Sequence, residues 1–310
     1  MRLFLLTMTL AALRGEDSRR VVVTIDDLPF VTARVLPPDE VQARTEKLLS
    51  HLRVRRIPAI GFVNEGKLFE GEKEDPARVA LLELWLDAGM ELGNHTYSHL
   101  DLHGTPLEEF QEDVLRGEVV TGRLMSARGG VARFFRHPFL HTGRDLRTKE
   151  ALSSFLSSHG YRVAPVTIDN YDYLFARAYD LAEAGEKGRI SEAYLRYMSA
   201  AVEFYEGQSR AILEYDPPQI LLLHASSLNA ENLGRLLDSL GEKGYRFVSL
   251  DEALRDPAFS LPDAYVGPGG ITWLHLAGPS PAVFRRARSR VSPSPARFLP
   301  SCGSEIECAQ

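Results

Sequence analysis

Two histidines four residues apart, His95 and His99, are the strongest sign of metal chemistry in this chain of 310 residues. On a helical turn, side chains at positions i and i+4 face the same way, so the spacing predicts two imidazole ligands for one metal ion. The adjacent carboxylates Asp26 and Asp27 cannot both be buried at low free-energy cost without a cation or a proton between them. Asp27 with the two histidines forms a two-histidine, one-carboxylate set that suits zinc and other divalent ions.

The sequence offers few other candidate metal ligands. His103 continues the four-residue spacing, but Gly104-Thr105-Pro106 interrupts the helix, so we interpret His103 as structural. The two cysteines, Cys302 and Cys308, lie near the C-terminus. A disulfide scaffold and a cysteine-rich zinc site are therefore excluded from the body of the chain, and any metal there must use histidine and carboxylate ligands.

Two more polar residues directly follow apolar segments. Arg136 comes after Phe134-Phe135 and could hold a carboxylate in a bidentate pair or form a surface salt bridge. His224 ends the apolar run that begins at Ile220. A histidine at the end of a buried strand is usually a structural group, but a carboxylate partner would raise its pKa and let it act as a general acid.

The segments that must position these residues alternate between strand-like and helix-like patterns. Strands are predicted at 21–25, 57–63, 90–93, 132–135, 162–168, 219–224 and 245–250, and helices at 75–89, 105–127, 144–158, 190–206 and 229–242. Repeated strand–helix units indicate a parallel sheet with outer helices, and we expect a single barrel-like α/β domain. The polar residues follow the strands, and the carboxyl ends of parallel barrel strands converge on one face, where active sites form.

The composition is ordinary for a globular protein. Hydrophobic residues make up 44% and charged residues 25%, which excludes wholesale disorder, collagen and coiled coil. The net charge of −6 lacks the basic footprint of a nucleic-acid-binding protein, so no nucleic-acid partner is expected.

The two ends differ from the body. Residues 1–15 begin with one positive charge and an apolar run of about eleven residues, which predicts a secretory leader and export. That run is too short to span a bilayer, so no integral membrane span is expected. Residues 279–310 are rich in Pro, Arg and Ser without an apolar period, which predicts a disordered tail. The catalytic domain is accordingly predicted at 16–278, and the oligomeric state stays open.

Taken in order, these residues resemble the polysaccharide deacetylases of carbohydrate esterase family 4, the NodB homology domain. That family shows an Asp-Asp motif, a His-x-x-x-His motif, an Arg-Pro-Pro-Tyr motif, an Asp-x-x-Asp-Trp motif and a Leu-x-His motif. The matching segments here are Thr24-Ile25-Asp26-Asp27, Asn94-His95-Thr96-Tyr97-Ser98-His99, Arg136-His137-Pro138-Phe139, Asp169-Asn170-Tyr171-Asp172-Tyr173 and Leu222-Leu223-His224. Each motif is weak alone, but five in sequence are specific.

The resemblance implies a distorted (β/α) barrel of the polysaccharide deacetylase type that holds one divalent metal ion. The ligands would be Asp27, His95 and His99, and the ion would be Zn²⁺, with Co²⁺, Mn²⁺ or Ni²⁺ as alternatives.

The resemblance also implies the acid–base residues. Asp26 would be the general base with Arg136 as its partner, and His224 would be the general acid, oriented and charged by Asp172. The backbone N–H of Phe139 would help to bind the oxyanion. The expected reaction is removal of an acetyl group from an N-acetylated or O-acetylated glycan, such as chitin oligomers or peptidoglycan.

Several positions depart from the family pattern. Leu28-Pro29 follows the Asp pair in place of glycine, His137 replaces a proline, Phe139 a tyrosine and Tyr173 a tryptophan. The proposed ligands and acid–base residues are intact, so hydrolysis is still expected, but the identity of the substrate is open. The segment 173–205 is rich in Tyr and Phe and is interpreted as a packed helical excursion rather than a sugar-stacking lid.

Three other functions remain alternatives. The apolar, aromatic motif segments would also suit a small-molecule amidase of the same fold. A metal phosphoesterase could use paired Asp and His, although two-metal enzymes need more ligands than this chain offers. A glycan-binding protein without catalysis is disfavoured because Asp26 and His224 are both present.

Overall fold

The computed structural model describes residues 19–263, 265–267, 272–276 and 292–299. Its main sheet is parallel, in the order β7-β6-β5-β2-β1-β8, with β9 paired to β1. The strand bounds are β1 Arg20–Leu28, β2 Ala59–Val63, β5 Glu91–Asn94, β6 Phe134–Phe135, β7 Arg162–Val163, β8 Gln219–His224 and β9 Arg246–Phe247. A bridge between Ile168 and Leu221 links the segment after β7 to β8, so the sheet curls almost closed. The predicted distorted (β/α) barrel is confirmed.

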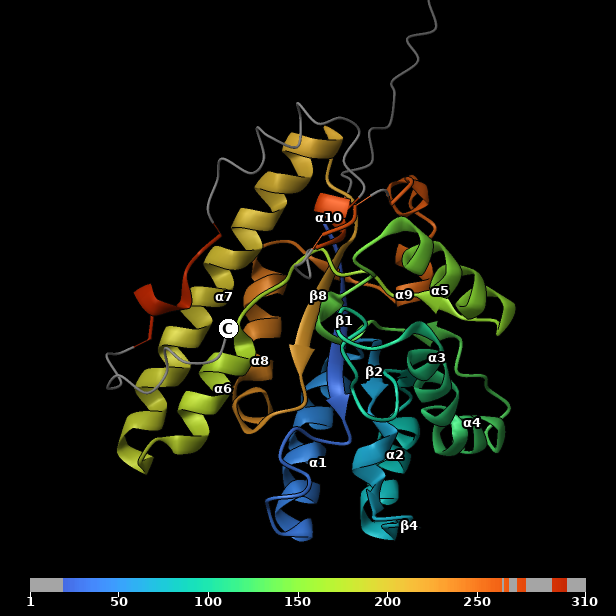
Figure 1. Ribbon diagram of the computed structural model, residues 1–310. Coiled ribbons are helices and arrows are strands. Elements are labelled where there is room, and N and C mark those ends of the chain that lie inside the picture. The colour runs from blue at the N-terminus through green and yellow to red at the C-terminus, as the bar shows by residue number, and fades with distance from the viewer. Residues whose placement is uncertain (1–18, 264, 268–271, 277–291, 300–310) are drawn as a thin grey trace, which may run out of the picture.

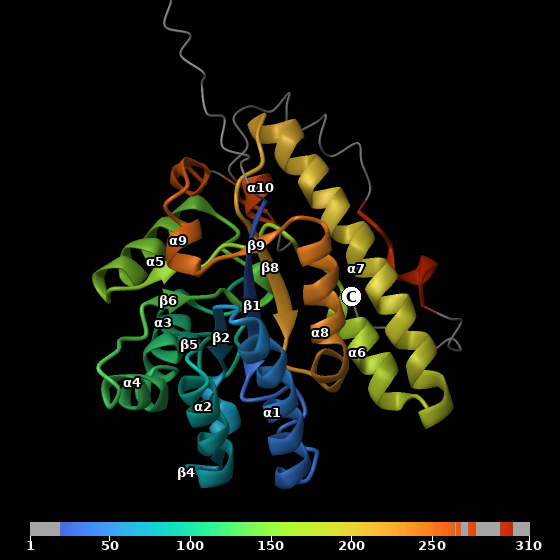
Figure 2. The same ribbon diagram turned by 180° about the vertical axis from the view of Figure 1, so that it is seen from behind.

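Helices surround this sheet (Figure 1). The group α6, α7 and α8 lies on one side, α3, α4 and α5 lie on the other, and α1 and α2 lie between them, as the reverse view shows (Figure 2). The α-helices are α1 Pro38–Arg55, α2 Pro76–Asp87, α3 Leu107–Arg116, α4 Val119–Ser126, α5 Leu146–Ser158, α6 Asp172–Leu181, α7 Ala184–Leu213, α8 Ser227–Glu242, α9 Leu250–Ala253 and α10 Trp273–Leu276. Short elements complete the chain: β3 Phe69–Glu70, β4 Lys73–Glu74, η1 Glu65–Leu68, η2 Pro138–Leu140, η3 Pro257–Ser260 and η4 Pro295–Arg297.

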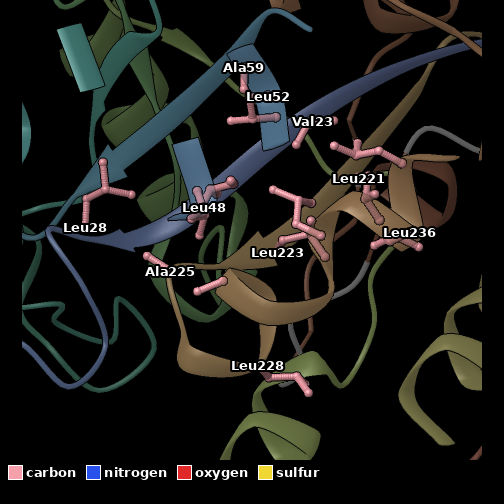
Figure 3. Packing of buried hydrophobic residues seen from close by; sticks show 14 of the residues in the cluster. Val23, Leu28, Leu48, Leu52, Ala59, Leu221, Leu223, Ala225, Leu228 and Leu236 are labelled. Atoms are coloured by element: carbon pink, nitrogen blue, oxygen red, sulfur yellow. The ribbon is translucent and has the colours of Figure 1, made fainter. Parts of the chain in front are cut away.

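The central strands are buried on both faces. Val23 of β1 and Leu221 of β8 have no exposed surface, as expected for strands of a parallel sheet covered by helices. Figure 3 shows Leu48 and Leu52 of α1 and Leu236 of α8 gathered around these strands. At about 1.5–3 kcal/mol for each fully buried aliphatic side chain, this cluster fixes β1 and β8 rigidly at the middle of the sheet.

Several predicted elements are confirmed. The helix predicted at 75–89 is α2, and the Asp75 side chain caps it by accepting hydrogen bonds from the N–H groups of Ala77 and Arg78. The helices predicted at 144–158 and 229–242 correspond to α5 and α8. The strands at the sheet margin are shorter than predicted, because β6, β7 and β9 each contain two residues.

The single helix predicted at 105–127 is wrong. The chain forms α3 and then α4, with a break at Gly117, and Pro106 occupies the cap position of α3 without a side-chain hydrogen bond. A Cβ on Gly117 would lie 2.5 Å from the backbone carbon of Thr96. The helix therefore ends where another part of the backbone passes against it.

The segment 173–205 folds into α6 and the first part of α7, which is longer than the predicted helix at 190–206. Tyr194 and Tyr197 are buried in the core against Phe175, so most of its aromatic residues serve packing. Tyr173 is the exception, with 46% of its surface exposed.

The predicted leader and most of the predicted tail lie outside the described residues, so these boundaries stay predictions. Within 292–299, the ring of Phe298 packs edge-on against Tyr197, 5.6 Å between centroids. None of the described helices is both long enough and apolar enough to cross a membrane.

Candidate active site

Asp27, His95 and His99 come together at the carboxyl ends of β1 and β5. Each offers one ligand atom, and these atoms all lie within 4.8 Å of one another. His99 Nε2 is 3.9 Å from Asp27 Oδ1, and the two imidazole rings meet edge to face at 4.9 Å. The three residues predicted as metal ligands are thus neighbours in space.

The helical turn expected for the two histidines is wrong, because residues 95–99 form a loop. Asn94 begins this loop by accepting a hydrogen bond from the Thr96 N–H at 2.7 Å, and the Thr96 hydroxyl accepts one from the His99 N–H at 2.9 Å. These side-chain contacts bend the backbone so that both imidazoles face one point. The four-residue spacing correctly predicted that His95 and His99 are neighbours, but a loop brings them together instead of a helical turn.

The surroundings of these three candidate ligands suit a bound cation. His95 Nδ1 is hydrogen-bonded to the carbonyl oxygen of Arg136 at 2.8 Å, which assigns the proton to Nδ1 and leaves Nε2 as a ligand atom. Burial lowers the pKa of His95 well below its ordinary value and also lowers the pKa of His99, so both are neutral. Asp26 Oδ1 is buried and lacks a hydrogen-bond partner among the described residues. Two neutral imidazoles, a carboxylate and a nearby unsatisfied oxygen fit a divalent ion.

Lys67 of η1 contacts the same Asp27 carboxylate oxygen as His99. Its ammonium nitrogen lies 3.1 Å from Asp27 Oδ1 and 3.3 Å from the Asp27 carbonyl oxygen. Burial alone would raise the pKa of Asp27, but Lys67 and the neighbouring histidines lower it below its ordinary range. Asp27 is therefore ionised. The sequence analysis did not identify Lys67, which lies 40 positions from Asp27 along the chain.

Asp26 and Arg136 lie at the bottom of the site. The Arg136 Nη1 atom is 3.9 Å from Asp26 Oδ2, an ion-pair distance, while Nη2 donates a 2.9 Å hydrogen bond to the Thr24 hydroxyl. The guanidinium is fully buried and stacks over Phe62, 4.8 Å from the ring centroid. Burial raises the pKa of Asp26 to about 6 against the lowering effect of Arg136. Asp26 can therefore exchange a proton near neutral pH.

His224 ends β8 and is paired in register with Asp26 of β1. Its Nδ1 atom lies 2.7 Å from Asp172 Oδ1, and its backbone N–H donates to Asp172 Oδ2 at 2.8 Å. Although burial acts to lower it, the charge and hydrogen bond of Asp172 raise the pKa of His224 to about 9. The imidazole is therefore a cation at neutral pH.

Asn229 of α8 completes this arrangement and was missed by the sequence analysis. Its amide group donates to Asp172 Oδ2 and to the carbonyl oxygen of His224, both at 2.8 Å. Its amide oxygen accepts a 2.7 Å hydrogen bond from Tyr194. The buried carboxylate of Asp172 is thus fully engaged and cannot reorient without losing several partners.

A cavity of about 870 Å³ opens above these groups. Of the predicted site residues, six line it: Asp26, Asp27, His95, His99, Phe139 and His224. Arg136 and Asp172 do not line it and contact the cavity residues from behind. Much of the remaining wall is apolar or aromatic, with Tyr171, Tyr173 and Leu181 on the α6 side.

The backbone around the cavity is unusual. Seven non-glycine residues of the described chain have a positive φ, and two of them, Arg56 and Glu214, simply end helices. The other five lie in the site loops: Asp27, Thr96, His99, Phe139 and Leu140. Such conformations are costly for residues with a Cβ and tend to gather at functional sites.

Comparison with known proteins identifies a family that the chain resembles. The family model described as polysaccharide deacetylase matches residues 14–163. The predicted resemblance to the polysaccharide deacetylase family is confirmed. No curated protein matches the chain.

Several solved structures are similar to this chain. A peptidoglycan N-acetylglucosamine deacetylase superposes with a TM-score of 0.50 at 18% identity, covering 76% of this chain and 88% of its own. A family 4 carbohydrate esterase from Streptomyces lividans, bound to acetate, gives 0.47 at 18% identity, covering 76% and 96%. A family 4 pseudoenzyme from Bacillus anthracis gives 0.49 at 17% identity, covering 77% and 66%.

Proposed function

We propose that this protein is a metal-dependent hydrolase that removes acetyl groups from an N-acetylated or O-acetylated glycan. One observation carries the proposal: Asp26 and His224, paired in register on adjacent strands, have pKa values raised to about 6 and about 9 beside the Asp27, His95 and His99 cluster. A base and an acid matched to neutral pH are therefore held beside a candidate metal site.

The metal ion that we propose is Zn²⁺, with Co²⁺, Mn²⁺ or Ni²⁺ as alternatives, held by Asp27, His95 and His99. When bound, it would polarise the acetyl carbonyl and acidify a water molecule.

Residues of the protein carry out the remaining steps. Asp26 accepts a proton from the attacking water, and Arg136 keeps this carboxylate charged despite its burial. Water oxygen bonds to the acetyl carbon, and the N–H of Phe139 donates to the resulting oxyanion. His224 then gives a proton to the leaving amine as the C–N bond breaks, and acetate is released. Asp172 holds His224 in the required tautomer.

The test is acetate release from chitin oligomers, peptidoglycan and acetylated xylan, with and without a chelator. We expect chelation to abolish turnover and Asp26→Asn to lower kcat by about 10²–10⁴-fold, because the general base is lost. Asp238→Asn is the matched control, since this exposed carboxylate pairs with Arg55 on the surface. Activity that survives both chelation and Asp26→Asn contradicts the mechanism.

A second candidate is a small-molecule amidase of the same fold, which the aromatic and apolar cavity wall favours. Release of acetate from small N-acetyl compounds, but from no glycan, would support it. Phosphate release from a phosphoester without acetate release would instead support the phosphoesterase alternative. Binding of sugar without turnover would support a glycan-binding protein. Export through the N-terminal segment belongs to the main proposal and is tested by localising the full-length chain.

A further inference from the structure

A second pairing of histidine and aspartate, of which the histidine lines the same cavity, has no part in the proposed mechanism. His141, just after η2, has its Nδ1 atom 2.6 Å from Asp101 Oδ1, and its side chain lines the cavity. His103 stacks on the His141 ring, with 3.9 Å between centroids and 9° between planes. We infer that Asp101 and His141 form a recognition pair for a hydroxyl group of the sugar residue next to the one that is deacetylated; this inference rests on the proposed function.

A second metal site does not explain this cluster, although Asp101, His103 and His141 offer atoms within 4.8 Å of one another. The lone pair of an imidazole nitrogen lies in the plane of its ring, and zinc needs nitrogen ligands at about 2.0–2.1 Å. Two parallel rings stacked face to face cannot both direct lone pairs at one ion. In addition, His103 Nε2 accepts a hydrogen bond from the N–H of Gly143 at 3.2 Å.

The contacts of His141 determine what it can bind. The Asp101 carboxylate accepts a hydrogen bond from Nδ1–H and also from the N–H of His103 at 2.8 Å. With the hydrogen bond to Asp101 made by Nδ1–H, the acceptor lone pair of His141 is on Nε2. No hydrogen bond to Nε2 is found among the described residues. The group that this atom would take is a hydrogen-bond donor, and a sugar hydroxyl is the donor that an acetylated glycan carries on every ring.

The position of His141 relates it to the next sugar rather than to the reacting acetyl group. The ring of Phe139 contacts both imidazoles, with centroid distances of 5.7 Å to His141 and 4.5 Å to His99. Phe139 is 53% exposed and forms part of the cavity wall. A sugar whose acetyl group reaches His99 would therefore have its neighbour across Phe139, beside His141. The pair favours an oligosaccharide substrate over a small amide.

The experiment compares N-acetylglucosamine oligomers with p-nitrophenyl acetate, a small ester that reports on the reacting centre alone. We expect His141→Ala to raise KM for the oligomer by about three- to tenfold, the size of one hydrogen bond, while kcat stays within about twofold. Hydrolysis of p-nitrophenyl acetate should not change. His141→Gln, which keeps an acceptor, should restore part of the oligomer affinity.

Asp101→Asn tests the tautomer separately. An asparagine amide can donate to Nδ1 and so place the proton on Nε2, which would raise KM for the oligomer without changing hydrolysis of the small ester. His159→Ala is the control, because His159 is an exposed histidine on the far end of α5 whose ring contacts Phe155.

The outcomes separate this inference from the proposed function. An unchanged oligomer KM in His141→Ala, or an equal loss on both substrates, overturns the recognition role while deacetylation stands. Calorimetry also tests for a second equivalent of bound Zn²⁺ in the wild type. If this second equivalent is found and is lost in His141→Ala, the recognition role is overturned in favour of a metal site. If the wild-type protein hydrolyses no oligomer, calorimetric titration of the metal-free protein with the oligomer decides: binding weakened by His141→Ala supports the pair, and no binding overturns both proposals.

Discussion

The cavity holds two imidazole–carboxylate pairs with almost the same contact distance, 2.7 Å for His224 and Asp172 and 2.6 Å for His141 and Asp101. Their surroundings differ. The Asp172 side chain has no exposed surface and accepts hydrogen bonds from three donors on two elements, whereas 41% of the Asp101 side chain is exposed. Burial of the imidazole opposes its protonation, and the charge and hydrogen bond of the buried Asp172 are what keep His224 protonated as a source of a proton. The distance between two side chains therefore does not tell what a pair does.

The first test of this comparison removes the imidazole of His224 and that of His141 in separate variants. We expect His224→Ala to lower kcat by about 10²–10⁴-fold, because the leaving amine loses its proton donor. His141→Ala should leave kcat near that of the wild type. Steady-state kinetics on one oligosaccharide substrate with both variants checks this, and similar losses of kcat would show that the two pairs are equivalent.

The second comparison concerns stability. Removing the buried carboxylate with Asp172→Ala should destabilise the protein by about 3–5 kcal/mol, since His224, Asn229 and a backbone N–H all lose their partner. Asp101→Ala should cost less than about 1 kcal/mol because its pair is partly solvated. Urea unfolding at pH 7 measures both, and equal midpoints would contradict the role that we assign to burial.

The third and smallest effect concerns pH. Because the pKa of His224 is raised to about 9, its protonated form persists up to that pH, and activity should fall as the pH rises through about 9. Asp172→Asn removes the charge that raises this pKa, so the alkaline fall should move toward the ordinary histidine value of about 6.5. Asp101→Asn should leave the fall in place. The pH profile of kcat for the three proteins checks the shift, and a profile unmoved in Asp172→Asn would assign the alkaline fall to another group.

The fold class could be predicted from the sequence because buried parallel strands are continuous apolar runs and the candidate residues directly follow them. Helix α1 was not anticipated, although Pro38 in the first turn, followed by Asp39 and Glu40, is a recognisable start signal. The break between α3 and α4 had no such signal. Gly117 there is needed because the backbone of Thr96 passes against it, which depends on tertiary packing alone.

The candidate site, like the fold, could be predicted only in part from the sequence. The eight predicted site residues meet in and behind one cavity because strand ends converge, a property of the fold. Lys67 and Asn229 were missed because their partners, Asp27 and Asp172, lie far away in the chain, 40 and 57 positions. Neither residue stands in a motif that predicts a contact with a carboxylate. Lys67 and Asn229 are recognised from packing, whereas residues that stand in a motif can be recognised from their type and spacing, as Arg136 and Asp172 were although neither lines the cavity.

The positive-φ loops around the cavity set stability and activity against each other. At Leu140, which has a positive φ, glycine would fit the observed backbone with less strain. A laboratory selection for heat resistance alone should therefore recover glycine at such positions, and these clones would have a looser site. A selection for hydrolysis at the same temperature should discard them. Sequencing the survivors of the two selections would map, residue by residue, where this protein gives up stability of the fold for its chemistry.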